Sequence, residues 1–193
     1  MTILYLHGFR SSPDSFKARL VRQKMAVLGR AGELVCPQLP ASPQQAIALA
    51  LSHVDGVPSA ELAIIGSSLG GYYATWLAEQ LGCRAVLLNP AVNPLASLER
   101  HVGVTSAWHS GAPFEFKRAY IDELGALATA HITLPERYFL LAASGDDVLD
   151  YRAMVAHYPG ARQHVIDGSD HGISDFAQYV DDVLAFCLPK VAR

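Results

Sequence analysis

The sequence predicts an α/β fold in which a parallel sheet is covered by helices on both faces. Short apolar runs alternate with longer segments of helical periodicity along nearly the whole chain, which is typical of βαβ units. The apolar runs are almost continuous, as in strands that are buried on both faces. With 193 residues, the chain fits one domain over 1–193 that needs neither a metal nor a disulfide to fold.

Six apolar runs are the expected strands, and they span residues 2–6, 33–36, 62–65, 85–88, 138–143 and 163–166. Helices are expected between and after them, and four of these have a recognisable start. The first opens at Ser12-Pro13, the second at the capping box Ser42-Pro43-Gln44-Gln45, and the third directly after Ser68. Ser174 is expected to cap the last helix, and Pro189 to end it.

Apolar residues at helical spacing give the expected inward face of three helices. In the first helix these are Phe16, Leu20, Val21, Met25 and Leu28, and in the second Ile47, Ala50, Leu51 and Val54. In the last helix they are Phe176, Val180, Val183, Leu184 and Cys187. One connection breaks the alternation, because about fifty residues separate the fourth expected strand from the fifth. We expect about 95–133 to form a small lid or pocket wall with one or two short helices. An ordinary crossover helix is the alternative.

Composition and charge exclude several classes of function. The net charge is −3 and the basic residues are scattered among acidic ones, so we expect no nucleic-acid partner. The N-terminal apolar run is too short for a signal peptide and no run could cross a bilayer, which favours a cytoplasmic protein without a membrane partner. Cys36, Cys83 and Cys187 are too widely spaced for a disulfide framework or a metal-ligand set, and we expect no metal and no cofactor.

The motif Gly66-Ser67-Ser68-Leu69-Gly70-Gly71 matches G-x-S-x-G and lies between an apolar strand and a helical segment. In such a turn the serine has a strained backbone, and the helix N-terminus favours an anion beside its hydroxyl. We therefore predict that Ser68 is a nucleophile and that the Leu69 amide donates to an oxyanion. A tight turn in which Ser68 is only an N-cap is the alternative.

A second oxyanion donor is expected in the loop after the first strand, where His7-Gly8-Phe9 occurs. We predict that the amide of Phe9 is this donor. His7 is expected to hold the loop by hydrogen bonds, and its use as a catalytic base is the less favoured alternative.

The acid and the base are predicted from their places in the chain. Asp146 heads an Asp-x-Val-Leu stretch after the fifth expected strand, with Asp147 as its closest competitor and Asp150 expected on the following helix. His171 alone among eight histidines lies between the last strand and the last helix. The order serine, aspartate, histidine is that of α/β-hydrolases. The sequence thus predicts a serine hydrolase acting on small carboxylic esters or thioesters.

Aromatic side chains are candidates for an apolar substrate pocket. Tyr72, Trp108 and Phe114 are the substrate-binding residues that we predict, and burial in the core is the alternative for each. Two other classes of function remain open. A small peptidase or amidase would need a charged anchor for a free amine, and a binding protein would have no need of all three triad groups.

Several blocks of the sequence resemble the YqiA-like bacterial esterases of the α/β-hydrolase superfamily. These blocks are Leu6-His7-Gly8-Phe9, Pro37-Gln38-Leu39-Pro40, the segment 66–76, Asn89-Pro90-Ala91-Val92 and the segment 145–152. The resemblance implies a cytoplasmic esterase active on short acyl esters, or on acyl-CoA thioesters, without a large cap domain. It also implies six parallel strands in the order 2-1-3-4-5-6. Residues 97–133 conform least, which leaves the substrate preference open.

Overall fold

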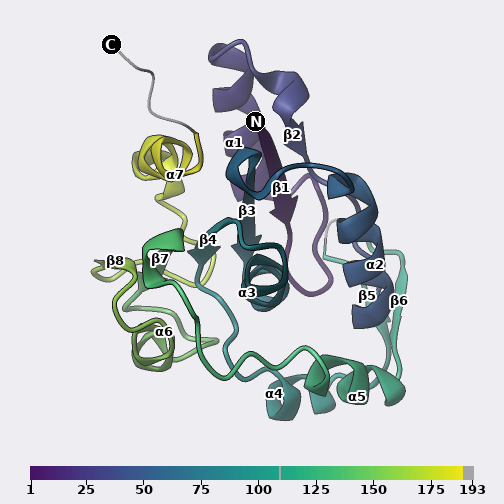
Figure 1. Ribbon diagram of the computed structural model, residues 1–193. Coiled ribbons are helices and arrows are strands. Elements are labelled where there is room, and N and C mark those ends of the chain that lie inside the picture. The colour runs from purple at the N-terminus through teal and green to yellow at the C-terminus, as the bar shows by residue number, and fades with distance from the viewer. Residues whose placement is uncertain (109, 189–193) are drawn as a thin grey trace.

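A six-stranded parallel sheet forms the centre of the protein (Figure 1). The computed structural model describes residues 1–108 and 110–188. The strands of this sheet are β1 (Thr2–Leu6), β2 (Leu34–Val35), β3 (Leu62–Ser67), β4 (Arg84–Leu88), β7 (Tyr138–Ala143) and β8 (Arg162–Ile166). They lie in the order β2-β1-β3-β4-β7-β8, and every neighbouring pair is parallel. Counted along the chain this is the order 2-1-3-4-5-6, so the predicted fold class is confirmed.

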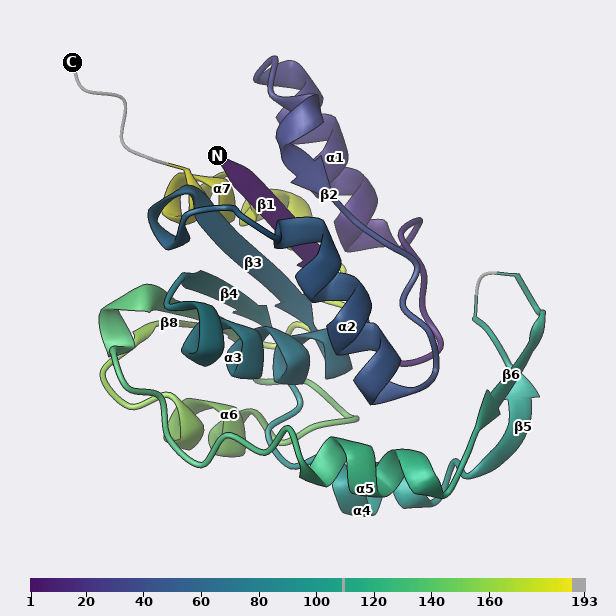
Figure 2. The same ribbon diagram turned by 45° about the vertical axis from the view of Figure 1, so that its right-hand side comes forward.

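Helices cover both faces of the sheet (Figure 2). One face packs against α1 (Phe16–Val27) and α7 (Val180–Cys187), and the other against α2 (Pro43–Val54), α3 (Leu69–Leu81) and α6 (Tyr151–His157). Successive strand residues point to opposite faces. In β1, Ile3 and Tyr5 accordingly join the α1 side, while Leu4 and Leu6 join the α3 side. Every residue of β3 and β7 is buried, which explains why these runs are apolar without alternation.

The first helix begins later than predicted. Ser12-Pro13 lies in the preceding turn, where the Ser12 carbonyl accepts a hydrogen bond from the Ser15 amide at 3.1 Å, and α1 starts at Phe16. Phe16 and Leu28 were expected in the core, but their exposed fractions are 43% and 52%. Phe16 lies roughly 140° around the helix from the buried Val21, and Leu28 follows the last turn.

The prediction that Ser42 caps the second helix is confirmed, whereas the prediction that Ser174 caps the last helix is wrong. The Gln45 amide donates to Ser42 Oγ at 3.2 Å. The Ser174 side chain caps no helix, because a 3₁₀ turn at Phe176–Gln178 intervenes and α7 begins only at Val180. The Ser174 amide instead donates to Asp170 Oδ1 at 2.8 Å. The predicted inner stripe of this segment is buried as expected, and Pro189 lies outside the described residues.

The long connection between β4 and β7 holds two short helices and a hairpin. The helices are α4 (Leu95–Glu99) and α5 (Ala119–Gly125). Between them, β5 (Gly103–Ser106) pairs antiparallel with β6 (Pro113–Phe116), and this hairpin extends beyond the central sheet (Figure 2). The hairpin was not predicted, and within the described part of the connection there is no single crossover helix.

The three cysteines are free thiols, and burial raises the pKa of Cys36 and of Cys83 to about 11. Across residues 1–108 and 110–188, no three side chains of His, Cys, Asp or Glu converge as they would around a metal ion. In the same residues, no helix has the length and apolar character needed to span a bilayer.

Candidate active site

Ser68 lies at a sharp turn between the end of β3 and the start of α3. Its φ of 54° and ψ of −121° lie in a region that residues with a side chain rarely adopt. Hydrogen bonds hold this conformation, since the Ser68 amide donates to the Leu88 carbonyl at 3.0 Å and the Ser68 carbonyl accepts from the Gly71 amide at 2.8 Å. The turn places the hydroxyl at the carboxyl end of a central strand.

The glycines of the motif are required by close packing. A Cβ atom on Gly66 would overlap the Gly70 carbonyl oxygen and lie 2.6 Å from Ala74 Cβ. A Cβ atom on Gly70 would overlap the Leu6 carbonyl oxygen of the neighbouring strand. Side chains at these two positions would therefore push α3 away from the sheet and displace Ser68.

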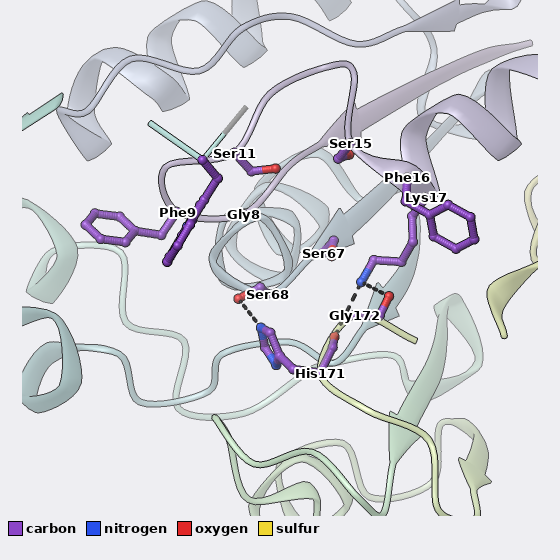
Figure 3. A pocket seen from close by; sticks show the side chains of 11 residues that line it. Gly8, Phe9, Ser11, Ser15, Phe16, Lys17, Ser67, Ser68, His171 and Gly172 are labelled. Atoms are coloured by element: carbon purple, nitrogen blue, oxygen red, sulfur yellow. Dashed lines mark hydrogen bonds between the residues drawn. The ribbon is translucent and has the colours of Figure 1, made fainter. Parts of the chain in front are cut away.

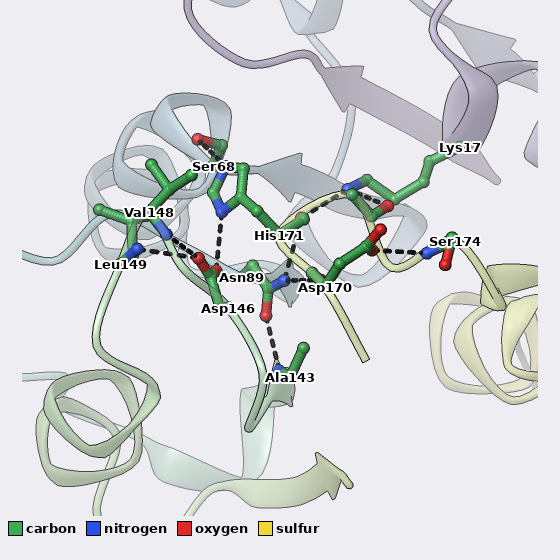
Figure 4. Close-up of polar contacts among 11 residues, drawn as sticks. Lys17, Ser68, Asn89, Ala143, Asp146, Val148, Leu149, Asp170, His171 and Ser174 are labelled. Carbon is green, nitrogen blue, oxygen red and sulfur yellow. Dashed lines mark hydrogen bonds and ion pairs between the residues drawn. The ribbon is translucent and has the colours of Figure 1, made fainter. Parts of the chain in front are cut away.

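The three predicted catalytic side chains meet at the carboxyl ends of the strands (Figure 4). His171 Nε2 lies 3.1 Å from Ser68 Oγ, and His171 Nδ1 lies 2.7 Å from Asp146 Oδ2. The Asp146 side chain is fully buried, whereas that of His171 is 25% exposed. The residues come from the turns and loops that follow β3, β7 and β8, so the parallel sheet places all three at the same edge.

Asp146 is held as a carboxylate with a fixed orientation. Its Oδ1 accepts hydrogen bonds from the amides of Val148 and Leu149, both at 2.8 Å, which leaves Oδ2 directed at His171 (Figure 4). Burial raises the pKa of Asp146, but the hydrogen bonds from His171 and from the two amides outweigh it, so this pKa lies below its usual value. A charged Asp146 fixes the proton of His171 on Nδ1 and leaves Nε2 to face Ser68.

The two competing aspartates lie elsewhere. Asp147 is exposed to solvent. Asp150 is the N-cap of α6 and accepts a hydrogen bond from the Arg152 amide at 2.9 Å, so it precedes the helix instead of lying on it. Among the described aspartates, only Asp146 forms a hydrogen bond with the His171 side chain.

The two predicted oxyanion donors, the amides of Phe9 and Leu69, belong to segments next to Ser68. Leu69 is the first residue of α3, a helix of 13 residues whose N-terminus carries a partial positive charge. Gly8 packs close to the serine, since a Cβ built on it would lie 3.6 Å from Ser68 Oγ, and Phe9 follows it. In the described part of the chain, neither the Phe9 amide nor the Leu69 amide donates a hydrogen bond, so both remain available to a ligand.

His7 holds the loop that carries Phe9. Its Nε2 accepts a hydrogen bond from the Leu39 amide at 3.0 Å, so the proton is on Nδ1, which donates to the Gly8 carbonyl at 3.0 Å. The side chain is 3% exposed. The interpretation of His7 as a structural residue therefore agrees with its contacts.

Two residues that the sequence analysis did not assign fix the loop of His171. Asn89 is fully buried, and its Nδ2 donates to the carbonyls of Asp170 and His171, each at 3.0 Å, while its Oδ1 accepts from the Ala143 amide at 2.7 Å. Asn89 thus joins the ends of β4 and β7 to this loop (Figure 4). Lys17 Nζ donates to the Gly172 carbonyl at 2.8 Å. Asn89 belongs to a block that carries the family resemblance, but no spacing in the sequence signals either role.

Because Lys17 is buried, the stability of the protein is expected to vary with pH in the alkaline range. Burial lowers the pKa of Lys17 from 10.5 to about 8, against the opposing influence of Asp170 and Asp146. Between these two values the unfolded chain holds more protons than the folded one, so the stability of the folded state rises with pH. We predict that the free energy of unfolding of wild type, relative to Lys17→Met, rises by up to about 3 kcal/mol between pH 8 and pH 10.5. Denaturant titrations across this range test it, and a constant difference would contradict the burial of a titrating ammonium group.

Two cavities meet at Ser68 and His171, and Figure 3 shows the first of them from close by. The first has a volume of about 250 Å³ and is bordered by polar groups that include Ser11, Ser15 and Lys17. The second has a volume of about 320 Å³ and a mainly apolar wall, which consists of Phe9, Leu69, Ala91, Pro94, Leu98, Trp108, Val148 and Leu149. The volume of the second cavity lies at the lower end of the range for small-molecule sites, and the first cavity adjoins it at Ser68.

The predicted pocket aromatics have three different environments. Trp108 is 68% exposed and lines both cavities. Phe114 lies edge-on to Phe9, with ring centroids 5.2 Å apart, and lines a smaller depression beside the Phe9 loop. Tyr72 is 5% exposed in the core and donates from its hydroxyl to the Leu124 carbonyl at 2.8 Å. Tyr72 borders neither of the two cavities, and its burial and its hydrogen bond to α5 agree with the core alternative.

The strand order, the strained turn at Ser68 and the loops that follow β7 and β8 define an α/β-hydrolase fold. The chain belongs to the family described as "Uncharacterised protein family (UPF0227)", whose model matches residues 2–188. This match confirms the resemblance to the YqiA-like group.

Solved structures share this fold at low sequence identity. A putative hydrolase from Agrobacterium vitis S4 is 20% identical with a TM-score of 0.76, and the match covers 97% of this chain and 88% of that one. Alpha/beta hydrolase domain-containing protein 10 from mouse is 17% identical with a TM-score of 0.71, over 95% and 89% of the two chains. Est1E from Butyrivibrio proteoclasticus, in its complex with ferulic acid, is 14% identical with a TM-score of 0.69, over 95% and 88%. These similarities show the fold.

Proposed function

We propose that this protein is a serine hydrolase that cleaves carboxylic esters or acyl thioesters of small molecules. The observation that carries the proposal is the hydrogen-bonded series Ser68–His171–Asp146 at the meeting point of two cavities. A serine hydroxyl is a weak nucleophile, and it needs a base at hydrogen-bond distance and a carboxylate that orients the base. The distances of 3.1 Å from Ser68 Oγ to His171 Nε2 and of 2.7 Å from His171 Nδ1 to Asp146 Oδ2 agree with both needs.

In the proposed reaction, Ser68 Oγ attacks the acyl carbon while its proton passes to His171 Nε2. The imidazolium that forms is stabilised by Asp146 through Nδ1–H. The proton then passes to the departing alkoxide or thiolate, and an acyl-enzyme remains. Water attacks this acyl group, gives its proton to His171, and the acid leaves as Ser68 recovers its proton.

Each tetrahedral intermediate carries a negative oxygen, for which the amides of Phe9 and Leu69 are the proposed donors. Donors that are already oriented stabilise this charge without reorganisation, and loss of one typically lowers the rate about 100-fold or more. The unpaired state of both amides in the described part of the chain supports this role.

The segment 95–133 is proposed to be a pocket wall within a single-domain enzyme. Leu98 from α4 and Trp108 from the hairpin turn border the second cavity, together with Leu69 and Leu149 from the sheet side. The acyl group or the alcohol would therefore contact a segment whose sequence conforms least to the family. Differences in this segment between members of the family would then change which substrates they prefer.

A peptidase or amidase is the nearest alternative function. Recognition of a free amine needs a carboxylate, but neither cavity is lined by an aspartate or glutamate within residues 1–108 and 110–188. A binding protein without turnover would have no use for a histidine and a buried carboxylate aligned on the serine.

A panel of acyl compounds tests the proposal. We expect release of butyrate from p-nitrophenyl butyrate or from butyryl-CoA, with a much lower kcat/KM for the p-nitroanilide of butyric acid. Hydrolysis of the anilide in preference to both others would favour the amidase alternative. If the protein cleaved none of these three compounds, and none of a wider set of esters and thioesters with other acyl lengths, the hydrolase function would be refuted.

A further inference from the structure

The second cavity is bordered by positive charge, although the protein as a whole is slightly acidic. The chain as a whole carries 18 acidic and 15 basic residues. The cavity is nevertheless bordered by two arginines, Arg10 and Arg100, and by no carboxylate within the described part of the chain. Several other arginines pair with carboxylates, for example Arg30 with Glu33 at 2.8 Å. Across residues 1–108 and 110–188, neither Arg10 nor Arg100 makes such an ion pair.

The guanidinium of Arg10 is held in place by neutral groups. Its Nε donates to the Ser106 carbonyl at 2.6 Å, and its Cζ lies 4.1 Å from the centroid of the Trp108 ring. The Trp108 amide in turn donates to the Arg10 carbonyl at 2.9 Å. These contacts orient the group while its positive charge stays uncompensated, as in a preformed anion site.

Arg100 and His101 approach the same cavity from the end of α4. Arg100 is the C-cap residue of that helix, and the His101 ring lies 5.6 Å from the Phe9 ring, centroid to centroid. Because the positive guanidinium groups of Arg10 and Arg100 border one small space without a carboxylate, an anion within that space is favoured. The cavity of about 320 Å³ is at the lower end of the range for small-molecule sites and also borders Ser68, so an anion bound there would lie near a group that reacts with Ser68.

We propose, on the basis of the hydrolase function proposed above, that the substrate carries an anionic group, a carboxylate or a phosphate, which Arg10 and Arg100 bind. The group belongs either to the acyl chain or to the alcohol or thiol that leaves. In either case the recognised group is the same. It is an anion with two oxygens that can bind a guanidinium group, next to a short apolar chain.

Matched ester pairs that differ only by a carboxylate and its isosteric carboxamide test this proposal. For the acyl side, the pair is the p-nitrophenyl monoester of adipic acid and that of adipamic acid. For the leaving-group side, it is 4-(acetoxymethyl)benzoate and 4-(acetoxymethyl)benzamide. We expect wild type to favour the carboxylate in one pair by about tenfold or more in kcat/KM, after subtraction of the uncatalysed rate, and the pair that responds identifies the source of the charge.

Arginine variants show whether the predicted residues carry this preference. Arg100→Gln is expected to lower the carboxylate-to-carboxamide ratio about tenfold, and Arg100→Lys to restore part of it. Arg19→Gln is the matched control, because Arg19 is exposed on α1 and borders neither cavity. The ratio should also fall as ionic strength rises from about 0.05 M to about 0.5 M, since the arginines are accessible to solvent.

A ratio of one or less in both pairs would overturn the anion site, as would a ratio that neither Arg100→Gln nor Arg10→Gln changes. In each of those cases the carboxamides are still hydrolysed, and the proposed hydrolase function stands. Absence of hydrolysis of all four compounds, together with absence of hydrolysis of the acyl panel, would remove the hydrolase function and the anion site with it.

Discussion

Ser68→Ala lowers kcat for ester hydrolysis about 10⁵- to 10⁶-fold, the largest effect that we expect from any single substitution. The hydroxyl would form and break the bond to the acyl group, and no neighbouring group could replace it. Alanine keeps the backbone strain at φ 54° and removes only the oxygen, so stability should change little. Steady-state kinetics with p-nitrophenyl butyrate measure the loss, and thermal unfolding shows whether the variant is folded.

Ser52→Ala is the matched control for this substitution. Ser52 lies on α2, where its hydroxyl donates to the Leu49 carbonyl at 2.8 Å, and it borders neither cavity. We expect its kcat to stay within about twofold of wild type. A folded Ser68→Ala protein with more than about a tenth of wild-type kcat would contradict the role of Ser68.

Asp146→Asn is expected to lower kcat about 10⁴-fold while the fold is kept. The two amides that donate to Oδ1 would select the carbonyl oxygen of the new side chain, so its NH₂ group would face His171. The NH₂ group requires an unprotonated Nδ1, and the proton of neutral His171 would then move to Nε2. In that tautomer His171 has no lone pair for the proton of Ser68.

Asp147→Asn is the adjacent control, because Asp147 is exposed and makes no contact with His171. Its kcat should stay within about twofold of wild type. The reverse pattern, with activity lost in Asp147→Asn and kept in Asp146→Asn, would show that the acid is assigned to the wrong aspartate.

The strands of the sheet and the positions of the three aligned side chains could be predicted from the sequence because both depend on local patterns, whereas the strand order was implied by the family resemblance. A buried parallel strand needs a continuous apolar run, and the turn at Ser68 needs glycines on both sides, where Gly66 and Gly70 pack against backbone. Residues that follow such runs must lie at the carboxyl edge of the sheet. The positions of Asp146 and His171 follow from that rule.

Other features depend on contacts between distant segments, for which the sequence has no signal. Asn89 forms hydrogen bonds with residues more than fifty positions away, and the buried Lys17 binds the carbonyl of Gly172 near the other end of the chain. Tyr72 is an aromatic residue of the kind that lines apolar pockets, but it is buried and its hydroxyl binds the Leu124 carbonyl 52 positions away. The hairpin from β5 to β6 was missed because its strands are short and largely exposed, so they show no buried apolar run.

The central claim, that Ser68 is a nucleophile activated by His171, is tested most directly by covalent labelling with a fluorophosphonate. The probe reacts with an activated serine hydroxyl, and intact-mass and peptide mass spectrometry identify the modified residue. We predict one adduct per chain, on Ser68, with labelling abolished in Ser68→Ala and strongly slowed in His171→Ala. A wild-type protein that stays unlabelled, or an adduct that forms equally well on Ser68→Ala, would contradict the claim.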